Sequence, residues 1–361
     1  MESESTKKNT IIILTSSDEP VGTSEYLQNL LKTDDNRVFI VKDTRYNTSS
    51  EFFFIKNKIK HNRYYSKEIA FLEGKKFLKF VKHTTVKRIA NMIYRYEPQL
   101  VITVTPLAHY LAIKAKQHYK SDVKIVNYIF RFVLDDRIYN DFTTDSFVVE
   151  NSQMREKLIS IGVKSINIAN LGFPFTLNKL SEEEVEDIKR KKGIPESKMI
   201  CIDLRDTTSL EDIFSMLIDQ GNKFNLVIRS YNNNYLDYLY KKLAGLNINV
   251  IFASNSEEFD KYLSFADLLI TDFNVVTIYK AFCVSVPIIG VSRELDSYKN
   301  LENLAEQGLI LATNENVKVI SYLYDMFQTE IRESLIKKSD NKMKFVVPEN
   351  IKNYLLSVGE K

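Results

Sequence analysis

Residues 267–290 read DLLITDFNVVTIYKAFCVSVPIIG, and this stretch decides the fold class. A buried apolar run ends at Thr271, a short polar turn follows, and a helical pattern begins before the next apolar run. In α/β proteins, such a strand, turn and helix unit is where phosphorylated ligands are held, at the carboxyl end of a parallel strand. The turn contains no glycine, and Lys280 stands one helical turn after Thr277. The stretch therefore raises the question of whether a nucleotide site is intact here.

The same alternation of short apolar runs and longer helical patterns continues along the whole chain. The runs are TIIILTS, RVFIVKD, QLVITVT, VKIVNYIF and SFVVEN, followed by MICIDL, FNLVIRS, INVIFAS, DLLITDF and VPIIGVS. Strands that are apolar throughout are buried on both faces, which indicates parallel sheets covered by helices. The series breaks between Gly172 and Pro195, where a turn, a charged helix and a second turn are expected. The sequence thus predicts two Rossmann-like α/β domains that face a central cleft.

Length and composition agree with this organisation. A chain of 361 residues is long enough for two domains, and 44% apolar with 27% charged residues is ordinary for a globular protein. Cys201 and Cys283 lie in apolar contexts without a CxxC pair, which predicts buried thiols in a reducing compartment. The polar start and the absence of long apolar runs predict a cytoplasmic protein with no signal peptide or membrane span.

Several common chemistries are excluded because their motifs are missing. The chain has no GxGxxG after a strand, no GxxxxGK[ST], no HExxH, no GxSxG and no Asp-x-Asp triplet. Its four histidines lie outside any metal-ligand spacing. We therefore expect neither a metal nor an organic cofactor.

Five stretches carry a resemblance to a known family. They are residues 89–116, 145–175, 183–194, 257–290 and 298–311, the last with the helix pattern N-x-x-x-L-x-x-x-G. In their order and layout they resemble the monogalactosyldiacylglycerol synthase and processive diacylglycerol glucosyltransferase family, over roughly residues 10–315. The resemblance implies a GT-B fold, a UDP-type sugar donor in the second domain and a lipid acceptor held by the first at a membrane surface. The expected domains are 1–175 on the acceptor and membrane side, 176–345 for the nucleotide sugar, and a last helix in 346–361.

Three ligand loops depart from the pattern of that family. The Gly-Gly-His loop after the first strand, which supplies a candidate base, corresponds here to Ser16–Glu25, with only Gly22 and no histidine. The Gly-rich loop that opens the second domain is replaced by CIDLRDTTSLEDIF, residues 201–214. In the opening stretch, Thr277 matches the family threonine, but Phe273–Val276 replace glycines and Lys280 replaces the ribose-binding glutamate. A lysine cannot accept hydrogen bonds from ribose hydroxyls.

Candidate donor-binding residues follow from this comparison and from the strand ends: Arg205, Arg229, Asp272, Asn274, Thr277, Lys280 and Asn300. Each also has a structural interpretation, because Asp272 or Asn274 suits a helix N-cap, either arginine suits a salt bridge, and Lys280 suits a solvated surface. No catalytic residue can be named. The stretch LLITDFNVV also resembles the Ile-Thr-Asp-Tyr-Ser-Ser motif of CDP-glycerol glycerophosphotransferases. This resemblance is confined to the one stretch and gives a minor alternative function.

A basic segment in the first domain predicts a membrane contact. Residues 56–95 hold twelve Lys or Arg against two Glu, with aromatic residues between the lysines. A basic amphipathic helix of this kind suits an anionic membrane surface, and the candidate contacts are Lys75, Lys76, Lys79, Lys82, Phe77 and Phe80. The alternative is a core-facing stripe with lysines on the wet face. No nucleic-acid-binding module is recognised, so nucleic acid is not an expected partner.

Two hypotheses of different class result. The first is an inverting, metal-independent hexosyltransferase that acts at the inner face of the cell membrane, with its base within Ser16–Glu25. The second is a catalytically inactive GT-B protein that binds a membrane or a partner, for example a second glycosyltransferase subunit. Under the second hypothesis, Phe273, Val275 and Val276 pack into the space that the donor occupies in the family.

Overall fold

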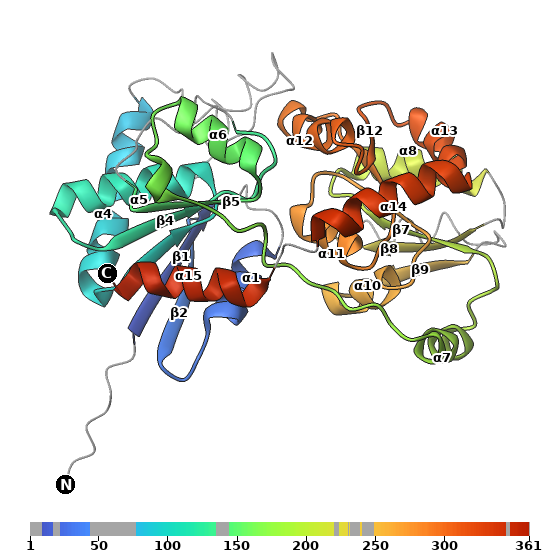
Figure 1. Ribbon diagram of the computed structural model, residues 1–361, viewed down its shortest axis with the longest axis horizontal. Helices are drawn as coiled ribbons and strands as arrows, with labels where there is room; N and C mark the ends of the chain where they lie inside the picture. The colour runs from blue at the N-terminus through green and yellow to red at the C-terminus, as the bar shows by residue number, and fades with distance from the viewer. Residues whose placement is uncertain are drawn as a thin grey trace, which may run out of the picture. The chain divides into compact units, whose positions relative to one another are not determined.

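The computed structural model of the chain describes residues 9–16, 22–43, 77–134, 144–219, 224–229, 231, 239, 249–343 and 347–360. It divides into two compact units, each of which is described by itself (Figure 1). Unit 1 consists of Met1–Pro174 with Val346–Lys361, and unit 2 consists of Phe175–Phe345.

Unit 1 alternates strands and helices from its first described residue. Its elements are β1 (Asn9–Ser16), α1 (Thr23–Leu31), β2 (Asn36–Asp43), α4 (Phe77–Tyr96), β3 (Leu100–Thr103), α5 (Pro106–Tyr119), β4 (Lys124–Tyr128), β5 (Ser146–Val149), α6 (Ser152–Ser160), the 3₁₀ turn η1 (Ser165–Asn167), β6 (Ile168–Asn170) and α15 (Pro348–Glu360). The described strands form a six-stranded parallel sheet in the order β2-β1-β3-β4-β5-β6. The strand order reverses between β1 and β3, which is the topological switch point of this sheet.

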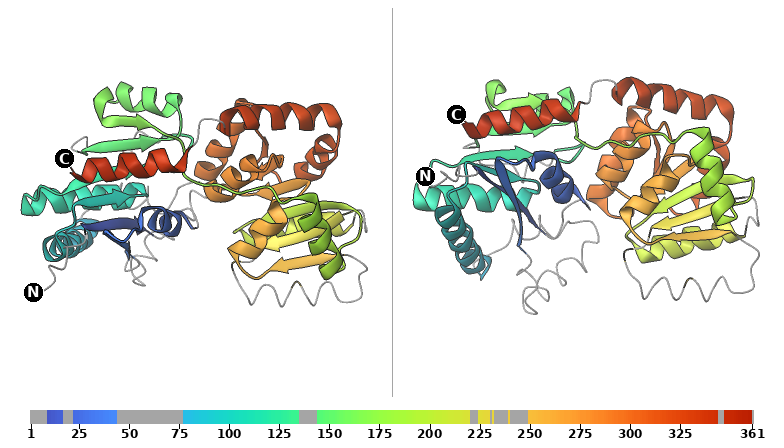
Figure 2. Two further views of the ribbon diagram at one scale, coloured as in Figure 1. Left: turned by 60° about the horizontal axis from the view of Figure 1, so that its bottom comes forward. Right: turned by 90° about the horizontal axis from the view of Figure 1, so that it is seen from below.

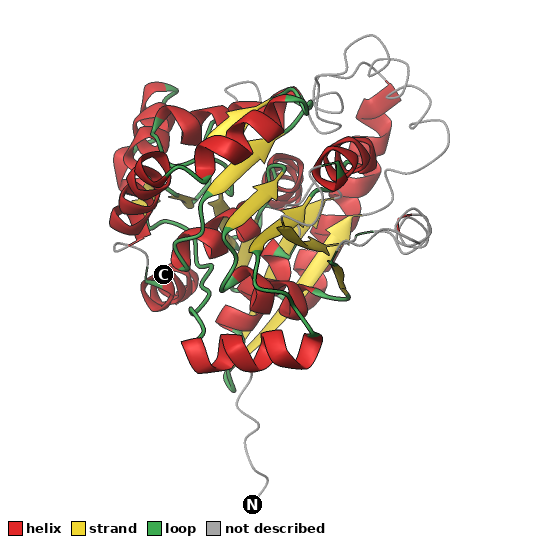
Figure 3. Ribbon diagram, turned by 90° about the vertical axis from the view of Figure 1, so that its right-hand side faces the viewer, coloured by secondary structure: helices red, strands yellow, loops and turns green. Residues whose placement is uncertain are grey.

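Apolar side chains cover both faces of the first sheet. Ile12 and Leu14 belong to the core beneath α4 and α5, together with Leu107 and Leu111 of α5. Because side chains alternate along a strand, the equally buried Ile11 and Ile13 face the opposite side of the sheet. Helices α1 and α15 pack together on unit 1, and α15 also contacts β3 and β4. Helices therefore lie on both sides of the strands (Figures 2 and 3).

Unit 2 repeats this architecture. Its elements are α7 (Glu182–Lys192), β7 (Lys198–Asp203), α8 (Thr207–Ile218), β8 (Phe224–Arg229), β9 (Val250–Ala253), α10 (Ser256–Leu263), β10 (Leu268–Thr271), α11 (Val275–Cys283), β11 (Ile288–Val291), α12 (Leu295–Glu306), β12 (Leu311–Thr313), α13 (Lys318–Met326) and α14 (Thr329–Met343). The strands described in this unit form a second six-stranded parallel sheet, ordered β12-β11-β10-β7-β8-β9. Here the switch point lies between β7 and β10.

The predicted strands are present, and the fold class predicted from their apolar runs is confirmed. Two further strands, β6 and β12, are only three residues long each, and both lie at sheet edges. Their brevity is why apolar patterning did not reveal them. The expected charged helix between the two sheets is α7, which begins with a capping box of Ser181 and Glu184 and ends at Gly193 with φ 63°.

Candidate functional site

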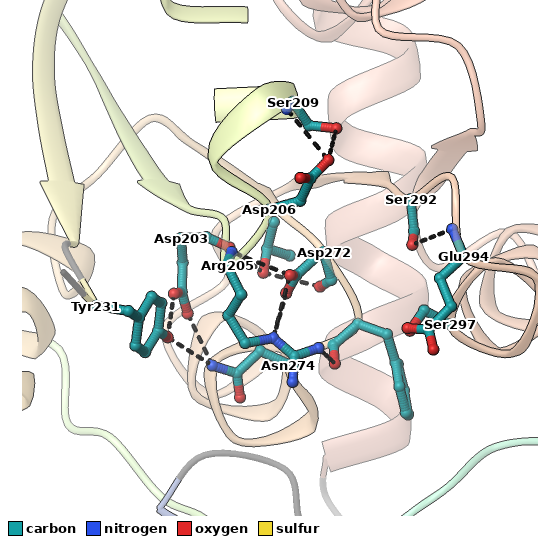
Figure 4. Close-up of polar contacts among 12 residues, drawn as sticks. Asp203, Arg205, Asp206, Ser209, Tyr231, Asp272, Asn274, Ser292, Glu294 and Ser297 are labelled. Carbon is teal, nitrogen blue, oxygen red and sulfur yellow. Dashed lines mark hydrogen bonds and ion pairs between the residues drawn. The ribbon is translucent and has the colours of Figure 1, made fainter. Parts of the chain in front are cut away.

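The candidate site lies at the carboxyl edge of the second sheet, beside the switch point between β7 and β10. In open α/β sheets, ligands bind at this position because the loops on either side diverge there. Asp203 ends β7 and Arg205 follows it, Arg229 ends β8, and Asp272 and Asn274 follow β10. The sheet thus brings together polar residues that are up to about seventy positions apart in the chain (Figure 4).

Asp203 is the centre of one buried hydrogen-bond network. Its side chain has no exposed surface. The hydroxyl of Tyr231 donates to Oδ1 at 2.5 Å, while the hydroxyl of Thr277 and the amide of Asn274 donate to Oδ2 at 2.5 and 3.0 Å. The guanidinium of Arg229 lies 3.6 Å from the same Oδ2. Burial, with the charge of Asp203 next in importance, raises the pKa of Tyr231 well above its ordinary value.

Arg229 is held on several sides. Its guanidinium donates to the hydroxyls of Thr277 at 3.3 Å and Ser256 at 2.6 Å. The same group lies over the rings of Tyr231 and Phe259, at 5.2 and 5.7 Å from their centroids. Arg229 is 8% exposed, and inside the protein its charge is balanced by the Asp203 carboxylate and further stabilised by the two aromatic faces.

Arg205 forms a second ion pair, with Asp272. The backbone N–H and Nε of Arg205 both donate to Oδ2 of Asp272 at 3.1 Å, and Nη2 donates to the carbonyl oxygen of Phe273 at 3.0 Å. Burial raises the pKa of Asp272 above its ordinary value, although the nearby Arg205 offsets part of that increase. Arg205 and Arg229 therefore both form salt bridges, as their structural interpretation predicted.

Lys280 forms a third ion pair, and its interpretation as a solvated lysine is wrong. Its ammonium group donates to Oδ2 of Asp260 at 2.6 Å, and the two side chains are only 14% and 19% exposed. Burial raises the pKa of Asp260, while Lys280 works in the opposite direction. Asp260 lies on α10, and no sequence signal links it to a lysine on α11.

The helix N-termini at this edge are capped from within the chain. At α8, the carboxylate of Asp206 accepts from the backbone N–H groups of Thr208 and Ser209 at 3.3 and 3.2 Å. At α11, Asn274 is the N-cap and accepts from the N–H of Thr277 at 3.5 Å. The first N–H groups of a helix are natural anion donors. In this chain, side-chain oxygens already accept from several of them.

Each of the three cations at this edge has a carboxylate partner. Arg205, Arg229 and Lys280 pair with Asp272, Asp203 and Asp260 respectively. Asp203, Tyr231, Asp260 and Ser256 take part in these networks but were not among the sequence-predicted site residues. A polar residue at the end of the central strand β7 was the available signal for Asp203. The described residues include no group of three or more His, Cys, Asp or Glu that could hold a metal ion.

Apolar side chains fill the turn and first helical turn after β10. Val275 is fully buried, and Phe273 and Val276 are each 6% exposed. Asn300 is buried on α12, the helix after β11, at 1% exposure. The neighbouring N-terminus of α12 carries Ser292, whose hydroxyl accepts from the N–H of Glu294 at 3.2 Å (Figure 4).

The candidate membrane contacts lie largely outside the described part of the chain. Lys75 and Lys76 precede α4, and Phe77, Lys79, Phe80 and Lys82 lie in α4 at positions whose side chains are not described. None of the helices described is both long and apolar enough to cross a bilayer. In the loop after β1, Gly22 has φ 79° and begins α1, while residues 17–21 lie outside the described residues.

Comparison with protein families supports the resemblance in unit 1. The family model of monogalactosyldiacylglycerol (MGDG) synthase matches residues 23–175, which is less than half of the chain. No curated protein matches the sequence.

Solved structures with the GT-B fold match nearly the whole chain. MnaA of S. aureus in complex with UDP has a TM-score of 0.66 at 14% identity, covering 97% of both chains. UDP-GlcNAc 2-epimerase from Neisseria meningitidis bound to UDP-GlcNAc has a TM-score of 0.63 at 14% identity, covering 96% of this chain and 100% of that one. Anabaena Alr3699/HepE in complex with UDP and glucose has a TM-score of 0.60 at 12% identity, covering 97% and 99%. The protein therefore has a glycosyltransferase-like GT-B fold.

Proposed function

We propose that this protein transfers a sugar from a nucleotide donor, of UDP type, to a lipid or lipid-linked acceptor at a membrane surface. The observation that carries the proposal is the buried polar cluster at the switch point of the second sheet, where GT-B proteins and other open α/β folds receive their ligands. The match of unit 1 to MGDG synthase and the UDP complexes of the structural neighbours support the donor class and the acceptor class.

In this proposal the donor lies at the edge formed by Arg205, Arg229, Asp272, Asn274, Thr277, Lys280 and Asn300. Unit 1 takes the acceptor and approaches an anionic membrane through the basic segment around the start of α4. The reaction is an inverting, metal-independent transfer, with a base from the loop that follows β1. The expected location is the inner face of the cell membrane, where the protein is peripheral.

A second candidate function is favoured by the charge pairing. A diphosphate needs cations or free N–H groups to replace the water it loses on binding. Here the three cations at the edge pair with three carboxylates, and the N-termini of α8 and α11 are capped by side chains. The alternative is therefore a non-catalytic GT-B subunit that binds a membrane or a partner glycosyltransferase.

Calorimetry distinguishes the two functions. UDP, CDP, UDP-glucose, UDP-galactose and CDP-glycerol are titrated into the full chain, and release of UDP is measured with diacylglycerol-containing vesicles. Under the transferase proposal, one UDP conjugate binds and Thr277→Ala weakens it by about 1 kcal/mol, the net contribution of one neutral hydrogen bond. Thr313→Ala is the matched control, because Thr313 is a buried threonine at the end of the edge strand β12, two strands away from β10. It should leave binding unchanged.

If no nucleotide gives a binding heat at millimolar concentration and no UDP is released, the transferase function is eliminated and the non-catalytic function remains. Binding of CDP-glycerol alone would instead favour the glycerophosphotransferase alternative. If Thr277→Ala and Thr313→Ala reduce the heat of nucleotide binding equally, the nucleotide binds away from this edge.

A further inference from the structure

We infer that the carboxylate of Asp203 acts as an internal anion, which occupies an anion-binding cradle formed by Arg229, Tyr231, Asn274 and Thr277. Shortening Asp203 should open this cradle to an external oxyanion. The inference goes beyond the proposed function, because it concerns an anion at the position of the Asp203 carboxylate and not the nucleotide donor.

The arrangement of donors around Asp203 supports this inference. Tyr231 donates a hydrogen bond to Oδ1, Asn274 and Thr277 at the start of α11 donate to Oδ2, and the guanidinium of Arg229 at the end of β8 forms an ion pair with Oδ2 at 3.6 Å. Figure 4 shows the phenol of Tyr231 and the amide of Asn274 both directed at the Asp203 carboxylate. Hydroxyl, amide and guanidinium donors that converge from separate elements are how proteins hold bound phosphates and carboxylates.

The number of donors exceeds what a structural ion pair requires. Arg229 already has hydrogen bonds to the hydroxyls of Ser256 and Thr277 and two aromatic faces. Tyr231, Asn274 and Thr277 each add a separate donor to the same carboxylate. Removal of this one anion would leave the buried Arg229 without its carboxylate and the hydroxyls of Tyr231 and Thr277 without their acceptor, while the amide of Asn274 would keep only the hydroxyl of Tyr231, at 3.2 Å. This loss is costly unless another anion replaces the carboxylate.

The cradle also borders the surface of unit 2. Asp203 is completely buried, but Tyr231, which covers its Oδ1, is 40% exposed. Displacement of the Tyr231 ring is therefore a route by which a small anion could reach the position of the carboxylate. With Asp203 in place, an incoming phosphate would meet a negative charge there, which disfavours its binding.

The test is anion rescue of Asp203→Ala. Loss of a partner from a buried ion pair is expected to lower the unfolding midpoint of the chain by roughly 10 °C in chloride buffer. Formate or phosphate at 100 mM, compared with chloride at equal ionic strength, should then raise the midpoint by about 4 °C if the dissociation constant is on the order of 10 mM. The wild-type chain should show no such specific increase, because its own carboxylate fills the cradle.

Two further variants make the result interpretable. Asp212→Ala removes a carboxylate that pairs with Arg293 and Asn316 but is 46% exposed, so anions should affect it as they affect wild type. Asp203→Asn keeps the shape of the side chain without its charge, and it should fold yet gain nothing from formate, because the amide occupies the space. If Asp203→Ala is recovered only as unfolded chain, refolding yield in formate against chloride gives the same comparison.

The inference is overturned if neither formate nor phosphate stabilises or refolds Asp203→Ala more than Asp212→Ala. It is also overturned if wild type responds as strongly as the variant. These outcomes are independent of the proposed function. Rescue of Asp203→Ala while wild type binds no nucleotide and releases no UDP would retain the inference and remove the transferase, and nucleotide turnover without rescue would do the opposite.

Discussion

At the scale of single residues, the partner of each cation sets what the edge of the second sheet can bind. The ammonium group of Lys280 on α11 lies 2.6 Å from the carboxylate of Asp260 on α10. A glutamate at position 280 would therefore bring two carboxylates together.

We expect Lys280→Glu to destabilise unit 2 by about 3 kcal/mol, since it replaces a mostly buried ion pair with like charges. The charge swap Lys280→Glu with Asp260→Lys should restore stability to within about 1 kcal/mol of wild type. Urea unfolding measures both. The matched control is Lys261→Glu, which removes a pair with Glu257 whose side chains are 61% and 87% exposed, and which should cost under about 0.5 kcal/mol.

If Lys280→Glu lowers the free energy of unfolding no more than Lys261→Glu does, the Lys280–Asp260 pair contributes no more than an exposed ion pair. If the double variant is no more stable than the single one, Lys280 and Asp260 do not interact as the structure indicates.

At the scale of elements, the last helix belongs to the first unit. Ile351 and Leu355 of α15 are fully buried, and the hydroxyl of Tyr354 lies 2.6 Å from that of Ser146 at the start of β5. Gly359 lies against β3, where an added Cβ would meet Leu100 at 3.4 Å. The chain thus leaves unit 1 after β6 and returns to it in α15, more than 170 residues later.

Leu355→Ala should therefore destabilise unit 1 by roughly 2–5 kcal/mol through loss of buried apolar contact and formation of a cavity. Amide hydrogen exchange is the suitable measurement, because it reports β3 and β4 of unit 1 separately from β7 and β10 of unit 2. Protection should fall in the first pair of strands and stay unchanged in the second. The exposed Asn353, two positions earlier on the same helix, provides the control Asn353→Ala. Faster exchange in β7 and β10 instead would show that α15 stabilises unit 2, which contradicts its assignment to unit 1.

At the scale of the whole molecule, charge is divided unequally between the two units. Unit 1 contains 29 Lys and Arg against 21 Asp and Glu, whereas unit 2 contains 21 against 26. Near an anionic surface each Lys or Arg contributes about 1 kcal/mol of attraction within a Debye length. A membrane that attracts this protein through charge should therefore attract unit 1.

We predict that reversing Lys75, Lys76, Lys79 and Lys82 to Glu abolishes sedimentation with phosphatidylglycerol-containing liposomes at low salt. A control with the same change in net charge reverses Lys189, Arg190, Lys191 and Lys192 of α7, a helix of unit 2 with no buried residues. That control should still sediment. Equal loss of sedimentation in both variants would mean that net charge rather than the basic segment governs binding, and no loss in either would assign the lysines to solubility.

The sequence by itself determined the strands of four or more residues, the helices between them and the parallel arrangement of the strands, because these depend on patterns within ten or twenty residues. Apolar runs buried on both faces require helices on both sides. The polar residue after a strand also starts the next helix, as Asn274 does for α11. The same local logic placed Arg205, Arg229, Asp272 and Asn274 at one edge of the sheet, since carboxyl ends of parallel strands share an edge.

Only the tertiary structure decided what those residues bind within the chain. Asp203 and Thr277 are 74 positions apart, and Arg205 and Asp272 are 67 apart. An arginine after a strand has the same local sequence whether it faces a phosphate or an aspartate, because the difference lies in which distant strand is its neighbour. The order β10-β7-β8 supplied that neighbour. It brought Arg205 and Arg229 each to a buried carboxylate, where the cost of leaving either charge unpaired holds the two together.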